Sequence, residues 1–274
     1  MMPEAPGLAG RPNAAAVPRP PRWSKIKYEG VLALAGLAVA WQIASYFVPP
    51  FLFPSVPAIA VRLVEIFTSW NTSLDALATG GRILLGLTGA FVLGSVLAVL
   101  MGRSERFARY AYPLLNFNQG VPALSWVVIS IIWFRGIEFR IFFIMVMTTL
   151  PAFSFQVLDA YRAMSKDLFE MTLSFRPSRY ALLRALIVPT VLPGVLTAWK
   201  VNLGNASRVV VVAELVGATG GVGYELLQQQ QLFDMAGAIA WTLVLVFFVL
   251  VVQRIITLLE NTMLRYRPAA ERSL

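Results

Sequence analysis

The chain has 274 residues, of which 58% are hydrophobic and only 14% charged, and its net charge is +9. Soluble domains carry about 25% charged residues, so this composition indicates a membrane protein rather than a soluble or nucleic-acid-binding one. The sequence contains no histidine and no cysteine, which removes the commonest general base, the commonest metal ligand and all thiol chemistry. We therefore expect no catalytic residue and no metal site.

Residues 1–28 are rich in proline, alanine and glycine and are predicted to form a disordered tail in the cytoplasm. A transmembrane domain is expected over residues 29–267, followed by a short cytoplasmic tail over residues 268–274. If the amino terminus is placed in the cytoplasm, most of the Lys and Arg residues fall on the cytoplasmic side of the membrane, near the ends of the apolar segments. The positive-inside rule therefore predicts that both termini are cytoplasmic.

Six apolar segments approach the roughly 20 residues that a helix needs to cross a bilayer, so the predicted fold is an all-α membrane protein with six transmembrane helices. Gln119, Gly120 and Pro122 interrupt the third segment, and the fifth contains Lys200 and Arg208. In chain order the segments are 29–48, 82–101, 112–134, 139–158, 192–216 and 236–259.

Between the first two segments, residues 54–70 are too polar to span a membrane. Val56, Ile59 and Leu63 recur at helical spacing there, which predicts a short amphipathic helix lying at the outer interface. In the second segment, small residues stand at every fourth position and predict a face for close packing of another helix. This stripe consists of Gly86, Ala90, Gly94, Ala98 and Gly102.

The polar loop over about residues 160–189 lies between two spans. Ser165 or Asp167 is placed to cap a short helix, and Pro177 is expected to end it. Leu168, Met171, Thr172 and Phe175 fall on one face of this helix. Such a helix suits the groove of a partner, although a surface helix without a partner would show the same pattern.

In position and layout this loop resembles the coupling loop of ABC-importer permeases, whose motif is EAA-x₃-G-x₉-I-x-LP. Glu170 and Pro189 match the motif, Leu186 and Val188 stand at its isoleucine and leucine, and Arg176 replaces its glycine. Further segments resemble the family in order: FLFPSVP at 51–57, the two prolines of 112–122, IWF at 132–134, VAEL at 212–215 and GGVGY at 220–224. The best fit is the nitrate/sulfonate/taurine (bicarbonate) branch of type I ABC importers.

The resemblance implies a transport subunit that is not itself an enzyme. It also implies that this subunit works as a dimer of two copies, with two ATPase subunits that hold ATP and Mg, and with a soluble binding protein outside the bacterial inner membrane. The implied substrate is a small anion, while an aromatic acid or a vitamin precursor remains an alternative, as does a self-contained channel or secondary transporter. The residues expected to contact the ATPase are Asp167, Leu168, Glu170, Met171, Phe175, Arg176, Pro177 and Pro189.

An intramembrane charge is costly and marks a functional site by default, so Arg208 is predicted to face an anion pathway. An ion pair with Glu214, which precedes a glycine-rich turn, is the alternative. For Lys200, extension to the cytoplasmic interface is the alternative to a functional role. The residues predicted to line the pathway are Gln119, Ser125, Trp126, Asn202, Asn205, Arg208 and Glu214. Of these, Asn202, Asn205 and Arg208 are spaced three residues apart and are predicted to share one helix face.

Arg176 carries a separate prediction, because glycine reaches positive φ angles that arginine reaches only at a cost. We expect Arg176 to avoid the left-handed turn, and its guanidinium to be held by an acidic or carbonyl partner. The chain is then expected to break at Pro177.

Overall fold

A computed structural model describes residues 26–263 of the chain. Most of the tail predicted over residues 1–28 and all of the tail at 268–274 therefore lie outside the described residues. The described part is built from helices, with no strand between residues 26 and 263. In chain order they are α1 (Ile26–Ser45), α2 (Val56–Thr68), α3 (Trp70–Arg103), α4 (Glu105–Gly120), α5 (Ala123–Trp133), α6 (Ile137–Arg162), α7 (Lys166–Ser174), α8 (Arg179–Leu182), a π-helical turn (Leu183–Ile187), α9 (Val188–Leu215), α10 (Val222–Gln231) and α11 (Met235–Met263).

Five of the predicted spans are continuous apolar helices: α1, α3, the α8–α9 rod, α6 and α11. The third predicted span is α4 followed by α5, which are bent by 94° at the break between them and make a sixth span if counted as one. The break falls at Val121 and Pro122, next to the residues that interrupt the pattern in the sequence. The six-span, all-α prediction is confirmed, with one span broken.

The second span begins earlier than predicted, at Trp70 instead of residue 82. The predicted span leaves out residues 70–81, which include Asp75 and Thr79. Both side chains accept hydrogen bonds from backbone N–H groups that are distant in the chain: Asp75 from Gly221 and Thr79 from Val222. Satisfied polar groups lose most of the penalty of burial, so the helix extends by three turns.

The core is formed where α3, α6 and α9 pack together, with Leu87, Met145 and Leu203 fully buried. The small-residue stripe on α3 faces α6, as predicted: a Cβ added to Gly86 would lie 2.6 Å from Met145, and one added to Gly94 would lie 3.1 Å from the backbone N of Ser154. These close approaches let the two helix backbones pack tightly.

The predicted amphipathic helix is α2. Ser55 caps it by accepting a hydrogen bond from the N–H of Ala58 (3.4 Å), and Ile59 and Ile66 are buried in a cluster that includes Trp241 of α11. One face of α2 is therefore held by apolar packing, and the opposite face is exposed.

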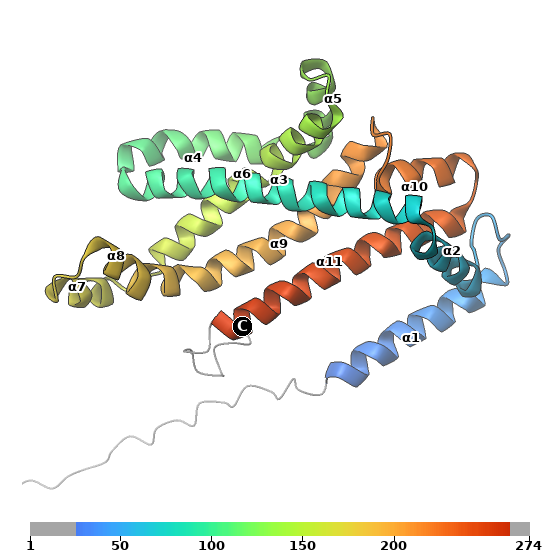
Figure 1. Ribbon diagram of the computed structural model, residues 1–274, viewed down its shortest axis with the longest axis horizontal. Helices are drawn as coiled ribbons and strands as arrows, with labels where there is room; N and C mark the ends of the chain where they lie inside the picture. Colours follow the sequence, from blue (N-terminus) through green and yellow to red (C-terminus); the bar gives the residue numbers. More distant parts are fainter. Residues whose placement is uncertain (1–25, 264–274) are drawn as a thin grey trace, which may run out of the picture.

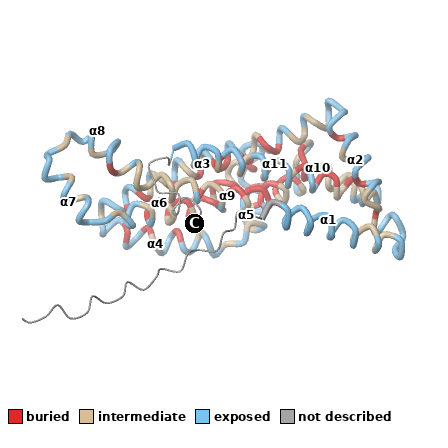
Figure 2. The backbone as a smooth tube through the Cα atoms, turned by 90° about the horizontal axis from the view of Figure 1, so that it is seen from below, coloured by how far each residue is buried: buried red, intermediate tan, exposed pale blue. Residues whose placement is uncertain are grey.

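The molecule is elongated, and its two ends differ (Figure 1). The end that carries α2 and α10 is opposite the end from which α7 and α8 project. The start of α1, the turn between α3 and α4 and the end of α11 all lie toward the α7–α8 end. Buried residues concentrate in the middle of the molecule, whereas α1 and α7–α8 are exposed along most of their length (Figure 2).

Candidate functional site

The projecting segment begins with α7, whose first turn is capped by Ser165. Its hydroxyl accepts a hydrogen bond from the N–H of Leu168 (3.4 Å), so of the two caps considered, serine is the one used. No residue of α7 is buried, and Phe175 is 78% exposed. The prediction of a short, exposed amphipathic helix is confirmed, while its contact with an ATPase stays a prediction.

Arg176 follows α7 with a φ of 47°. Its N–H donates to the carbonyl of Leu173 (2.9 Å), and its guanidinium has no hydrogen-bond or ion-pair partner within residues 26–263. The predictions that Arg176 avoids the left-handed turn and that its guanidinium is held by an acidic or carbonyl partner were therefore wrong. The turn that ends α7 lies at Arg176 and not at Pro177. A helix commonly ends on a left-handed residue because this geometry satisfies its last carbonyls, and that requirement outweighs the strain on arginine.

The chain returns from α7 to the core through a second local cap. Ser178 accepts a hydrogen bond from the N–H of Ala181 (3.2 Å) and starts α8. The π-helical turn over Leu183–Ile187 joins α8 to α9, with Pro189 at the start of α9. The segment thus continues into a transmembrane helix without a loop, so a displacement of α8 would be transmitted to α9.

On α9, the predicted pathway residues do not share a face. Asn202 is buried and donates to the side-chain oxygen of Gln156 (2.8 Å) and to the carbonyl of Ala198 (2.9 Å). Asn205 and Arg208 are exposed instead. Six residues turn a helix by roughly 240°, which carries Arg208 away from Asn202. The shared face is therefore limited to Asn205 and Arg208, and Asn202 ties α9 to α6.

Arg208 does not form the ion pair considered with Glu214. Its side chain has no hydrogen-bond or ion-pair partner in the part of the chain that the structure describes. Lys200, the other basic residue of α9, is paired with Glu260 of α11. Its charge is neutralised by this pair, which is a different outcome from simple extension to the interface. Arg208 is left as the unpaired charge on α9.

Glu214 lies instead in a buried polar cluster, which we call the Glu214 cluster. Its carboxylate accepts hydrogen bonds from Arg82 Nη1 (2.7 Å), the hydroxyl of Thr79 (2.8 and 3.0 Å) and the N–H of Gly223 (2.8 Å). The side chain of Glu214 has no exposed area. A carboxylate with this many donors is compensated for the loss of water.

Arg82 connects this carboxylate to two further elements. Its Nη1 also donates to the carbonyl of Gly220 (2.8 Å), and its Nε (3.0 Å) and Nη2 (2.6 Å) donate to Glu138 of α6. Gly221 has a φ of 113°, and a Cβ there would lie 2.6 Å from Glu214 Oε1 and 2.7 Å from Arg82 Nη1. The cluster therefore fixes α3, α6, α9 and the glycine turn together.

Sequence reasoning named Glu214 but missed Arg82 and Thr79. A signal was available, because Asp75, Thr79 and Arg82 are spaced by four and three residues and so fall on one helix face.

Nearby on α10, the pKa of Glu225 is raised by burial, with a further contribution from the negative charge of Asp75.

At the α4–α5 break, Gln119 is exposed and Ser125 and Trp126 are half-buried. Asn118 fastens the break to α6 by donating to the carbonyl of Met147 (2.8 Å). The indole N–H of Trp126 is buried without an acceptor between residues 26 and 263. No hydrogen bond or ion pair among residues 26–263 joins these side chains to Arg208, so their place in one pathway stays a prediction.

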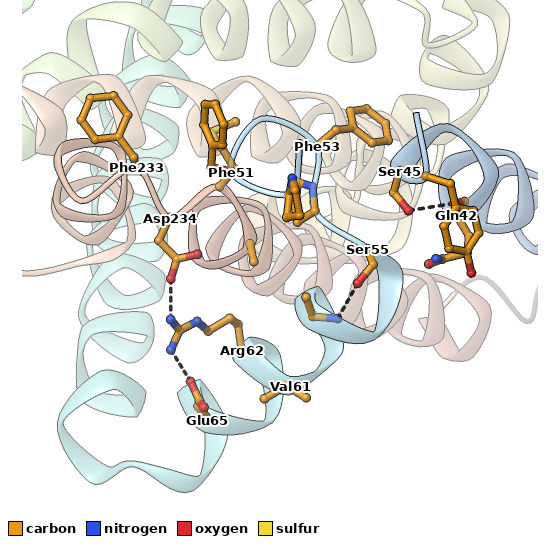
Figure 3. A pocket seen from close by; sticks show the side chains of 16 residues that line it. Gln42, Ser45, Phe51, Phe53, Ser55, Val61, Arg62, Glu65, Phe233 and Asp234 are labelled. Carbon is orange, nitrogen blue, oxygen red and sulfur yellow. Dashed lines mark hydrogen bonds and ion pairs between the residues drawn. The ribbon is translucent and has the colours of Figure 1, made fainter. Parts of the chain in front are cut away.

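A pocket of about 790 Å³ lies at the α2/α10 end, between the α1–α2 connection, α2 and the α10–α11 corner (Figure 3). Arg62 closes one side by pairing with Asp234 (2.7 Å) and Glu65 (2.8 Å), and these contacts raise its pKa, the hydrogen bond to Glu65 most of all. Phe51 and Phe233 are exposed beside it. Sequence reasoning did not anticipate this pocket, since its walls come from distant segments.

Curated relatives align with most of this chain. The formylaminopyrimidine transport permease protein ThiX of Halalkalibacterium halodurans is 29% identical over 87% of this chain and 96% of its own length. The putative aliphatic sulfonates transport permease protein SsuC of Bacillus subtilis is 26% identical over 99% of both chains. The taurine transport system permease protein TauC of Escherichia coli is 26% identical over 71% of this chain and 73% of its own.

The fold is also shared with a solved structure. A chain of the MetNI methionine ABC transporter in an inward-facing conformation superposes with a TM-score of 0.57 at 20% identity, covering 72% of this chain and 96% of that chain. Residues 90–265 match the family model described as the binding-protein-dependent transport system inner membrane component. The chain belongs to this family and is a multi-pass permease subunit of a type I ABC importer.

Proposed function

We propose that this permease carries a small anion of the sulfonate, taurine, nitrate or bicarbonate class across the bacterial inner membrane. Relatives named for aliphatic sulfonates, taurine and bicarbonate support the class. Two copies of the chain would enclose one central cavity and alternate between inward and outward access. The substrate would pass between the copies, along faces that are exposed in a single chain.

The exposed guanidinium of Arg208 is the observation that carries this proposal. It stands on α9, an apolar helix, with no partner among residues 26–263. An arginine within a span needs a partner or a water-filled cavity. In a homodimer, both copies of Arg208 would reach the same cavity, and Asn205, one turn before it, would add a hydrogen-bond donor for an oxyanion.

The α7–α8 segment would be the docking site for two ATPase subunits, which hold ATP and Mg. Within it Asp167 and Glu170 offer charge to a basic groove, and Leu168, Met171 and Phe175 offer an exposed apolar face. Arg176 and Pro177 would hold the end of α7, and Pro189 the start of α9. Movement of this segment would pass through the π-helical turn to α9 and so reach Arg208.

Both termini would lie in the cytoplasm. The start of α1, the end of α11 and the α7–α8 segment point toward one end of the molecule (Figure 1), which supports this orientation. A substrate-binding protein would then dock at the opposite end, where α2, α10 and the glycine turn before α10 lie.

A vitamin precursor is the competing substrate class, favoured by relatives named for formylaminopyrimidine and riboflavin. These molecules are built on heterocyclic rings, so they do not call for a free guanidinium in the pathway. The two classes can be separated by replacing Arg208 while following the uptake of both.

The test is uptake by the complete importer in vesicles, with labelled taurine, nitrate, bicarbonate and formylaminopyrimidine. We expect the wild-type importer to take up one of the anions. The uptake rate should fall about ten- to hundredfold in Arg208→Gln, since a hydrogen bond to a charged group contributes about 1.5–3 kcal/mol. Arg208→Lys should retain most of the uptake activity. Uptake of formylaminopyrimidine alone, unchanged in Arg208→Gln, would replace the anion by the vitamin-precursor class.

A further inference from the structure

A cavity of about 260 Å³ opens at the α7–α8 end, where the π-helical turn crosses α3 and α6. It is separate from the Glu214 cluster and from Arg208. Small-molecule pockets run from about 300 to 1,000 Å³, so this one has room for part of a single apolar chain. Its lining residues are Ala98, Val99, Gly102, Arg103, Val157, Leu158, Tyr161, Leu183, Ile187 and Val191.

The lining changes from apolar to polar in one direction. On α3 it runs from Ala98 to Arg103, the last residue of the helix, and on α6 it runs from Val157 to Tyr161, next to the last residue. Both helices end toward the α7–α8 side of the molecule (Figure 1). The cavity is therefore apolar toward the middle of the bundle and polar at its mouth.

Arg103 supplies an uncompensated positive charge at this mouth. It is exposed, and its guanidinium has no ion-pair or hydrogen-bond partner in the described part of the chain. The surrounding surface is apolar, with Val99 51% and Leu183 50% exposed. An apolar slot between membrane helices with a basic residue at its cytoplasmic end has the chemistry of a lipid site.

We propose that the cavity binds one acyl chain of an anionic phospholipid, with the lipid phosphate on Arg103. The acyl chain would lie against Val99, Val157 and Ile187, and the phosphate would accept hydrogen bonds from the guanidinium. A zwitterionic lipid offers the same acyl chain but brings its own positive charge, so it would bind more weakly.

The position of the site gives the lipid a regulatory role. Leu183 and Ile187 are the first and last residues of the π-helical turn, which joins the α7–α8 segment to α9. A bound acyl chain would fill the space beside this turn and limit its movement. Anionic lipid would then change how firmly α7–α8 is coupled to α9.

The test uses the intact importer assembly reconstituted in vesicles of phosphatidylcholine with and without phosphatidylglycerol, then extracted in detergent. Native mass spectrometry counts the phosphatidylglycerol molecules that stay bound to the assembly. This measurement does not depend on transport activity. Arg103→Gln removes the charge, and Arg106→Gln is its matched control, because Arg106 is also exposed without a partner in residues 26–263 but does not line the cavity. Gly102→Leu fills the cavity; a Cβ there meets Leu158 and Tyr161 only at 3.6 Å, so the helix can accept it.

We expect phosphatidylglycerol retention to fall several-fold in Arg103→Gln and in Gly102→Leu and to stay at the wild-type level in Arg106→Gln. The proposal would be overturned if Arg103→Gln retained as much phosphatidylglycerol as Arg106→Gln. It would also be overturned if the wild type retained as much phosphatidylcholine as phosphatidylglycerol. If Gly102→Leu fails to assemble, the two arginine variants still decide the outcome.

Discussion

The Glu214 cluster and the α7–α8 segment are both polar parts of an apolar protein, yet they are held in opposite ways. Glu214 has no exposed side-chain area and is fixed by donors from α3 and from the first turn of α10. In α7, by contrast, no residue is buried, and the side-chain hydrogen bonds of Ser165, Thr172 and Ser174 are all made with backbone groups of the same helix. One region is determined by tertiary contacts and the other by local sequence.

The difference shows where rigidity is required in this permease. The cluster lies where four segments must keep a fixed geometry, and removing any one partner leaves a buried charge or donor unsatisfied. The α7–α8 segment is capped by its own residues, Ser165 and Ser178, and leaves the apolar face of α7 exposed, which suits an element that binds another subunit. The same kinds of residue therefore stabilise the fold at one end and present a surface at the other.

The largest effect is expected from Arg82→Gln, which leaves Glu214 buried without its cationic partner. Breaking a buried ion pair from one side costs about 3–5 kcal/mol, so the midpoint of thermal unfolding in detergent should fall strongly. Arg135→Gln, which removes an exposed arginine, is the control and should leave the midpoint unchanged. The double variant Arg82→Gln/Glu214→Gln should recover part of the loss. A midpoint for Arg82→Gln equal to that of the control would show that the cluster does not stabilise the fold.

A smaller loss is expected from Gly221→Ala, which tests the turn inside the same cluster. The new Cβ would clash with Glu214 and Arg82 and would sit at a φ of 113°, so we expect a cost of about 2 kcal/mol or more. Gly81→Ala is the matched control on α3, because a Cβ there meets nothing within 4 Å. Thermal unfolding of the two variants gives the comparison, and equal midpoints would mean that the turn can move away from the cluster.

At the other end, Arg176→Gly should be slightly stabilising. Glycine accepts the left-handed conformation that arginine holds at a cost of about 1 kcal/mol, while it also gains freedom in the unfolded chain. The expected result is a local gain of up to about 1 kcal/mol, seen as slower amide exchange in α7 with an unchanged global midpoint. Faster exchange in α7 would show that the arginine side chain holds the turn through a contact made in the assembly.

The smallest change in stability is expected from Glu170→Lys, since substitutions at exposed sites usually fall within about 0.5 kcal/mol. Its effect should be on coupling instead: if Glu170 meets a basic group of the ATPase, charge reversal should loosen the assembly and separate ATP hydrolysis from transport. Co-purification and the ratio of hydrolysis to uptake measure this, with Lys166→Glu as the control on the same helix. Normal assembly and transport in Glu170→Lys would remove Glu170 from the docking surface.

Much of the fold followed from the sequence because it depends on local signals. Apolar runs of sufficient length predicted the spans, and the interruption at Gln119–Pro122 predicted the place where the third one breaks. The cap of α7 was narrowed to Ser165 or Asp167, since capping involves only neighbouring residues. The turn after α7 was placed one residue too late, at Pro177 instead of Arg176. The family resemblance added a predicted role for the loop, ATPase docking, which the residues alone left open.

The partners of the charged residues could not be predicted in this way. The sequence suggested an ion pair between Arg208 and Glu214, which lie on one helix, whereas Glu214 pairs with Arg82, 132 positions away in the chain. Asn202 was grouped with Arg208 by spacing, but its buried side is set by the position of Gln156 on α6. The choice among possible partners depends on which helices meet, and that information is not contained in any one segment.

The sequence by itself determined that the protein is a helical membrane protein, where its helices begin and end to within a turn in most cases, and that a short helix is exposed in a loop. The tertiary structure decided which charged residues are paired: Glu214 and Lys200 are neutralised by distant partners, whereas Arg208 and Arg103 have none within residues 26–263. The physical reason is that helix formation depends on hydrogen bonds between neighbours in the chain, whereas the energy of a charge in an apolar protein depends on the groups that packing brings within a few ångströms of it.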